Sequence, residues 1–136
     1  MEQVIEAIKK YDKDAIKSIF SKQAINETKN MDNGMNYLFD LIKGNIKSWK
    51  NETWASEKKV EGVKKSVEID SWYIVTTDEG VYKFFLLDYA TDTINPDNEG
   101  LYSLRAIKAE DEETQFTYME HIRIPGIYIP NTSSSK

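Results

Sequence analysis

A carboxylate set beside tyrosines is the arrangement in this chain best suited to chemistry. Asp88 follows the four apolar residues 84–87. A carboxylate in an apolar pocket can act as a general base when a tyrosine or a protonated acid faces it. Asp88 is therefore the candidate catalytic residue, although an acid at the end of a strand is more often solvated or caps a loop. The other acids and tyrosines that could form such a pair are Asp40, Asp70, Tyr37, Tyr73, Tyr82 and Tyr89.

A second candidate chemistry is metal binding by the polar loop 95–100. Oxygen-bearing side chains alternate there at Asn95, Asp97 and Glu99, and a glycine occupies the sixth position, as in the first half of a calcium loop. The twelfth position is Ala106, where a bidentate glutamate is required. The pattern therefore favours a turn held by Asn and Asp side chains, with these three residues as weak metal candidates.

The chain lacks the residues that most other cofactor sites and catalytic nucleophiles need. The chain has no cysteine and one histidine, His121. Zinc sites and serine triads need histidine with partners at set spacing, and the six scattered glycines form no phosphate loop. We expect no cofactor, and we expect His121 to be a surface residue or a local hydrogen bonder.

Aromatic residues are numerous and suggest either a core or a pocket. Tyrosine and tryptophan join an apolar body to a polar tip, which suits a pocket for an amphipathic ligand. Most of the aromatics are expected in the core. The four predicted to line a ligand pocket are Tyr37, Trp49, Trp72 and Tyr89.

Length and charge limit the class of protein. The 136 residues predict one domain over 1–130, followed by a flexible tail over 131–136. The net charge of −5 argues against a nucleic-acid partner, which needs a basic face. No stretch approaches the length of a membrane span.

Helical periodicity dominates the first third of the chain. Apolar residues at helical spacing predict helices over about 2–11, 13–21 and 31–43. Gly44 follows the last of these, where a left-handed cap is expected. The polar stretch 23–30 is predicted as a loop.

Extended segments follow, centred on a hairpin. The turn Asp78-Glu79-Gly80 separates a long strand starting near Val60 from a second strand over 81–89, and both flanks are rich in β-branched and aromatic residues. The polar stretch 51–59 is predicted as a loop or an irregular edge. The remaining predictions are a short strand over 46–49, a loop over 91–100, a strand over 101–108, a short helix over 111–120 and an extended segment over 122–130.

Helices first and antiparallel strands afterwards predict an α+β fold. The hairpin is too apolar on both faces to stand alone, so the helices should cover one face of a curved antiparallel sheet. A concavity between the two layers is the expected place for a ligand.

The opening VIEAIKKYDKDAIKSIF reads as a helix, a short charged break and a second helix ending in an aromatic residue. In this it resembles the start of the nuclear-transport-factor-2-like, or cystatin-like, fold group. Further motifs are YLF at 37–39, Gly44 with SW at 48–49, SWY at 71–73 with TTD at 76–78, the run LLDYATDTINPDNEGLYSLRAIKAED and the closing GIYIP. In these the chain more closely resembles an uncharacterised bacterial family of putative lipoproteins, domain of unknown function 5104.

The resemblance implies a fold and a place in the cell, and it implies no reaction. It implies an extracytoplasmic protein held at the membrane only through a lipid anchor, with a cytoplasmic protein as the alternative. The leading hypothesis is a non-enzymatic domain that binds a small amphipathic ligand or a protein partner. The alternatives are a small lyase or isomerase using a pocket carboxylate, and a homodimeric assembly module whose exposed strand face carries Tyr102, Leu104 and Ala106.

Overall fold

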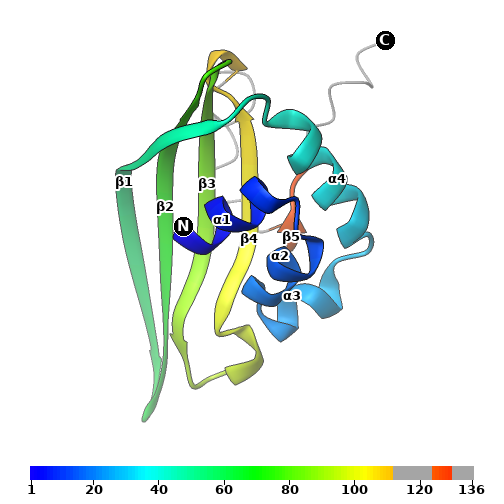
Figure 1. Cartoon of the computed structure of the whole chain (residues 1–136). Helices are drawn as coiled ribbons and strands as arrows, with labels where there is room; N and C mark the ends of the chain where they lie inside the picture. Colours follow the sequence, from blue (N-terminus) through cyan, green and yellow to red (C-terminus); the bar gives the residue numbers. More distant parts are fainter. Residues whose placement is uncertain (112–123, 130–136) are drawn as a thin grey trace.

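The computed structural model describes residues 1–111 and 124–129, and it contains four helices followed by a curved sheet of five strands (Figure 1). The elements are α1 Glu2–Lys10, α2 Lys13–Ile19, α3 Lys22–Glu27, α4 Met31–Leu41, β1 Ile46–Glu61, β2 Lys64–Thr77, β3 Val81–Asp92, β4 Gly100–Lys108 and β5 Gly126–Ile127. Two 3₁₀ turns, η1 Pro96–Asn98 and η2 Ala109–Asp111, flank β4.

Side-chain caps start three of the helices. The side chains of Asp12, Ser21 and Asn30 accept hydrogen bonds from backbone N–H groups three residues later, at 3.0, 3.1 and 3.0 Å. Such caps satisfy donors that have no partner inside the helix. The helices predicted over 2–11, 13–21 and 31–43 are confirmed. The loop predicted over 23–30 is wrong, because α3, capped by Ser21, spans Lys22–Glu27.

The strands lie in the order β1-β2-β3-β4-β5. The first four are antiparallel, and β5 runs parallel to β4, so the sheet is mixed and mostly antiparallel. The predicted α+β class is confirmed. The predicted hairpin turn is also confirmed: Thr76 pairs with Val81, and the Thr77 N–H donates to the Gly80 carbonyl oxygen at 2.9 Å.

Of the two alternatives for 51–59, the loop is wrong and the irregular edge is confirmed, because those residues belong to β1, an edge strand whose register shifts between Asn51 and Thr53. This strand is sixteen residues long and pairs with β2 along its whole length. The strand expected from Val60 onward starts instead at Lys64, after a turn containing Gly62 at φ +65°. Gly44 does take a positive φ, +88°, but it lies in the loop before β1, because Ile42 ends α4 in an extended conformation.

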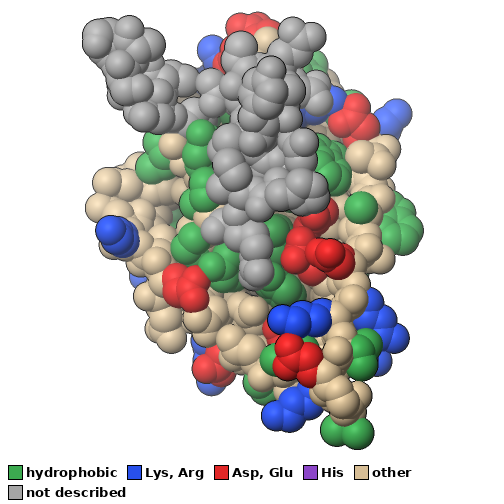
Figure 2. Space-filling view, turned by 180° about the vertical axis from the view of Figure 1, so that it is seen from behind, with side chains coloured by type: hydrophobic (Ala, Val, Ile, Leu, Met, Phe, Trp, Pro, Cys, Tyr) green, Lys and Arg blue, Asp and Glu red, His purple; other side chains and the backbone are tan. Residues whose placement is uncertain are grey.

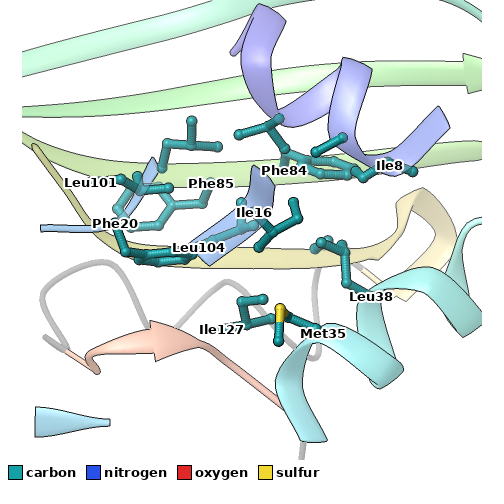
Figure 3. Close-up of a cluster of buried hydrophobic side chains, with 14 of the residues drawn as sticks. Ile8, Ile16, Phe20, Met35, Leu38, Phe84, Phe85, Leu101, Leu104 and Ile127 are labelled. Atoms are coloured by element: carbon teal, nitrogen blue, oxygen red, sulfur yellow. The ribbon is translucent and has the colours of Figure 1, made fainter. Parts of the chain in front are cut away.

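Much of the core lies between the helices and one face of the sheet, here called the helix face (Figure 3). The opposite face, here called the rear face, also carries buried apolar side chains, namely Phe85, Leu87 and Ile107. Ile8 of α1 lies against Phe84 of β3, and Met35 of α4 lies beside Ile127 of β5. Paired residues of an antiparallel sheet share a face. The helix face therefore carries Phe84, Leu86 and their partners Tyr73, Ser71, Ala106 and Leu104.

The face proposed for a homodimer is wrong, since Tyr102, Leu104 and Ala106 are all buried. Alternation along a single strand shows that one face is apolar and does not show what covers it. Ser103, Arg105 and Ile107, between these residues, are buried as well. The helix predicted over 111–120 lies outside the described residues beyond Asp111, as do His121 and the tail predicted over 131–136.

Candidate functional site

β1 is an edge of the described sheet, and it stands apart from the helices (Figure 1). Ile46 is half-buried and the other fifteen residues of the strand are exposed. Its sequence, IKSWKNETWASEKKVE, is mostly polar. Backbone pairing with β2 therefore holds the strand in place, and its outer backbone groups have no strand beside them among the described residues.

Two tryptophans lie on the helix face of β1. Trp49 pairs with Val75 and Trp54 pairs with Ser71. The Trp49 ring packs edge-on against Tyr73, with ring centroids 5.9 Å apart, and remains 39% exposed. Trp54 is 63% exposed. Tryptophan is enriched at protein interfaces, where it often carries a large share of the binding energy.

The far end of the β1–β2 hairpin carries further exposed apolar side chains. Val60 is 60% exposed and Val63, in the turn, is 100% exposed. Basic and acidic side chains are intermixed around this protruding end on the rear of the molecule (Figure 2). The edge is thus a long, mostly polar strip with a few exposed apolar side chains, at Trp49, Trp54, Val60 and Val63.

Asp88 lies on the helix face, opposite Ile69 on β2 and Leu101 on β4. Burial raises the pKa of its carboxyl group. Two of the tyrosines that might have faced it are bonded elsewhere. The Tyr37 hydroxyl donates to the Ala106 carbonyl oxygen at 2.8 Å, and the Tyr82 hydroxyl accepts from the Lys43 N–H at 2.9 Å.

The other two candidate acids and two candidate tyrosines lie apart from Asp88. Asp40 is on α4 and forms a surface ion pair with Lys43 at 3.7 Å. Asp70 faces the rear, opposite Leu87. Tyr73 contacts Trp49, and Tyr89 faces the rear with Glu68. These positions do not place any of the candidate tyrosines against the Asp88 carboxylate.

The four predicted pocket aromatics are not brought together. Trp49 lies on the helix face of the edge strand, whereas Trp72 packs on Phe85 on the rear face, with ring centroids 4.7 Å apart. Tyr89 packs edge-on against Tyr102, with ring centroids 6.0 Å apart. Tyr37 is on α4, and burial raises its pKa to about 12.

Tyr37 does line a broad hollow beside α4. The hollow has a volume of about 790 Å³ and also contains the rings of Tyr11 and Phe39, whose centroids are 5.5 Å apart. The amide residues Asn33 and Asn36 and the charged residues Asp40 and Lys43 also line it. Apolar rings beside amides suit an amphipathic small molecule.

The loop predicted as a weak metal site is held by its own hydrogen bonds. Asp92 accepts from the Asn95 N–H at 2.7 Å and from the Asn98 side-chain amide at 3.3 Å. Glu99 accepts from the Asp92 N–H at 3.0 Å. Within residues 1–111 and 124–129, no three acidic, histidine or cysteine side chains converge as metal ligands. This is the turn held by Asn and Asp side chains that the sequence favoured.

Sequence reasoning recognised only the start of β1, over 46–49, and missed the length of this strand, which is the longest of the described sheet and almost wholly exposed. Two signals could have found it. Gly62 separates two long segments of similar length, and the tryptophans at 49 and 54 interrupt a polar stretch that would otherwise be a typical loop.

No helix in the described part of the chain has the length and apolar character needed to cross a bilayer. No curated protein matches the chain. A family model described as "Domain of unknown function (DUF5104)" matches residues 3–109, which include nearly all of the four helices and the first four strands. That match agrees with the resemblance noted in the sequence, and the chain therefore belongs to the DUF5104 family.

Proposed function

We propose that this domain is a non-enzymatic protein-interaction module that binds its partner along the β1 edge. The observation that carries the proposal is the exposure of fifteen of the sixteen β1 residues. An edge strand of this length offers a row of backbone donors and acceptors to a further strand. Trp49 and Trp54 add exposed apolar area on the helix face of β1. Side chains of a strand added at this edge could pack beside them.

The location proposed for the module is the bacterial cell envelope. Its support is the likeness of the sequence to putative lipoproteins, in which a lipid anchor holds the protein at the membrane. The arrangement of helices over a curved sheet is also consistent with the nuclear-transport-factor-2-like group, whose members serve many functions. Fractionation of cells that express the full-length protein tests the location: recovery in the membrane fraction is expected, and recovery in the cytosol contradicts it.

Site-specific photo-crosslinking in cells tests the interaction itself. A photoreactive amino acid replaces Trp54 in the full-length protein, and a matched variant carries it at the exposed Lys10 of α1. The expected result is a crosslinked product at position 54 and none at position 10. Absence of any product at position 54 contradicts the proposal.

The hollow beside α4 supports a second candidate function, the binding of a small amphipathic molecule. Its support is the presence of Tyr11, Tyr37 and Phe39 beside amide side chains. Ligand-observed NMR with a fragment mixture, repeated on a Tyr11→Ala variant, tests it. Fragments that bind the wild-type protein and lose binding in the variant are expected; unchanged binding contradicts it. Catalysis at Asp88, as in a small lyase or isomerase, has less support, because the Tyr37 and Tyr82 hydroxyls are bonded elsewhere.

A further inference from the structure

We propose that β1 pairs with β1 of a second copy of this chain, antiparallel, with Trp54 opposite its own counterpart. The inference rests on the proposed use of the β1 edge and names the partner. The two sheets would join into one continuous sheet through a two-fold axis perpendicular to it, so that the helix face of one copy continues into the helix face of the other.

The pairing of β1 with β2 determines which residues of two such strands can lie opposite each other. Asn51 pairs with Tyr73 and Thr53 with Trp72, so Glu52 is an extra residue at a bulge. Residues before the bulge therefore alternate faces out of step with those after it. Two residues that lie opposite each other must point to the same face of the sheet. Once one residue of β1 is placed on the two-fold axis, this requirement determines all the other pairs.

With Trp54 on the axis, opposite charges face each other. Thr53 lies opposite Ala55 and, after the bulge, Asn51 opposite Ser56. Lys50 then lies opposite Glu57 on the rear face, and the symmetry produces this pair twice. Opposite charges directly across a strand pair stabilise it, and like charges destabilise it.

Aromatic residues meet in the same register. Trp54 lies beside its own counterpart on the helix face, which would bury two rings that are each 63% exposed in the single copy. Trp49 lies opposite Lys58, and that contact also occurs twice. A lysine ammonium group over a tryptophan ring is attracted by the negative face of the ring.

The two adjacent registers lack these contacts. Placing Ala55 on the axis sets Lys50 opposite Lys59, a repulsion that also occurs twice. Placing Thr53 on the axis sets Lys50 opposite Ala55 and leaves Glu57 opposite Ser48. Among these three registers, the charge pattern of β1 therefore favours the one centred on Trp54.

The negative net charge of the chain does not make one β1 strand repel another. The chain carries a net charge of −5, but β1 contains four lysines and three glutamates and is close to neutral. Lysines on an edge strand disfavour indiscriminate pairing. In the register centred on Trp54, Lys50 lies opposite Glu57 and Lys58 lies opposite Trp49.

A single introduced cysteine tests the register, because the chain has none of its own. Residues directly opposite in an antiparallel pair have Cα atoms about 5 Å apart, within reach of a disulfide. Trp54→Cys should therefore form a covalent dimer under mild oxidation. Glu57→Cys is the matched control, since its two copies would lie about 20 Å apart along the strands.

Charge exchange provides a test that keeps both tryptophans. Sedimentation velocity over a concentration series should show a monomer–dimer equilibrium for the wild-type protein. Lys50→Glu should raise the dissociation constant of the dimer about tenfold, and adding Glu57→Lys should restore it. Lys47 lies at the other irregular position of β1, between Ile46 and Ser48. Lys47→Glu makes the same charge change there and should change the dissociation constant little.

The outcomes separate this inference from the proposed function. A Trp54→Cys protein that stays monomeric after oxidation, or a wild-type protein that sediments as a monomer at every concentration, overturns the self-pairing. If position 54 then crosslinks to a different protein in cells, the interaction edge stands and the partner named here is wrong. If position 54 crosslinks to nothing, both proposals fail.

Discussion

The Tyr37 hydroxyl donates a hydrogen bond of 2.8 Å to the carbonyl oxygen of Ala106 and so ties the middle of α4 to β4. These residues lie sixty-nine positions apart in the chain. Tyr37→Phe keeps the ring and removes the donor. We expect the free energy of unfolding to fall by about 1 kcal/mol, measured by urea denaturation. Tyr11→Phe is the control: the Tyr11 side chain is 65% exposed, and little change is expected. Equal stability of the Tyr37→Phe and wild-type proteins would show that the bond contributes nothing.

Gly34 permits the close approach of α4 and β5. A Cβ at this position would lie 2.8 Å from Ile127 Cβ and 3.2 Å from the Ile127 carbonyl oxygen. Alanine favours a helix by about 1 kcal/mol over glycine. We nevertheless expect Gly34→Ala to destabilise the protein by about 1–2 kcal/mol, because β5 must move away. Thermal unfolding measures this, with the exposed Asn36→Ala on the same helix as control. A higher Tm for Gly34→Ala would contradict the packing of α4 on β5.

Asp88 should make the stability depend on pH. Burial raises its pKa in the folded state above the ordinary value of 3.8, so the folded protein holds this proton more tightly than the unfolded chain does. The ionised carboxylate therefore costs stability as the pH rises through the folded pKa, and below the ordinary value the cost disappears. Asp88→Asn should stabilise the protein at about pH 7, and the gain should vanish near about pH 3.

Urea denaturation at several pH values measures that difference. Asp40→Asn is the control, since the Asp40 side chain is 89% exposed. A destabilised Asp88→Asn protein at neutral pH would mean that the carboxylate has a stabilising partner. That result would also make Asp88 a stronger candidate for catalysis.

Calcium should not stabilise the loop over 95–100. The Asp92 and Glu99 carboxylates already accept hydrogen bonds from amide groups of the same loop. Thermal unfolding with and without millimolar Ca²⁺ should give the same Tm. A rise in Tm that Asp97→Asn abolishes would restore this loop as a metal site.

The sequence predicted an element correctly where burial of one face leaves a periodic pattern of apolar residues. The hairpin around Gly80 was predicted correctly because Tyr73, Val75, Tyr82 and Phe84 are packed against helices, and packing selects apolar residues at alternate positions. The capped helices α2 and α4 were predicted for the same kind of reason.

The sequence failed where an element buries little. β1 has no apolar alternation because both of its faces meet water, and pairing of its backbone with β2 is what makes it a strand. α3 buries only Ala24, so its periodicity is too weak to recognise and the Ser21 cap was its remaining signal. The pocket aromatics could not be grouped from sequence, because Trp49 and Trp72 lie on opposite faces and only the register shows it.

Backbone amide exchange of the purified protein, compared between dilute and concentrated solutions, tests the self-pairing of β1 most directly. Amides of β1 that point away from β2 should exchange quickly in dilute solution and become protected as the concentration rises. Peptides from β3, paired on both sides, should not change. Rapid exchange along β1 at every concentration would contradict the pairing of this edge with a second copy.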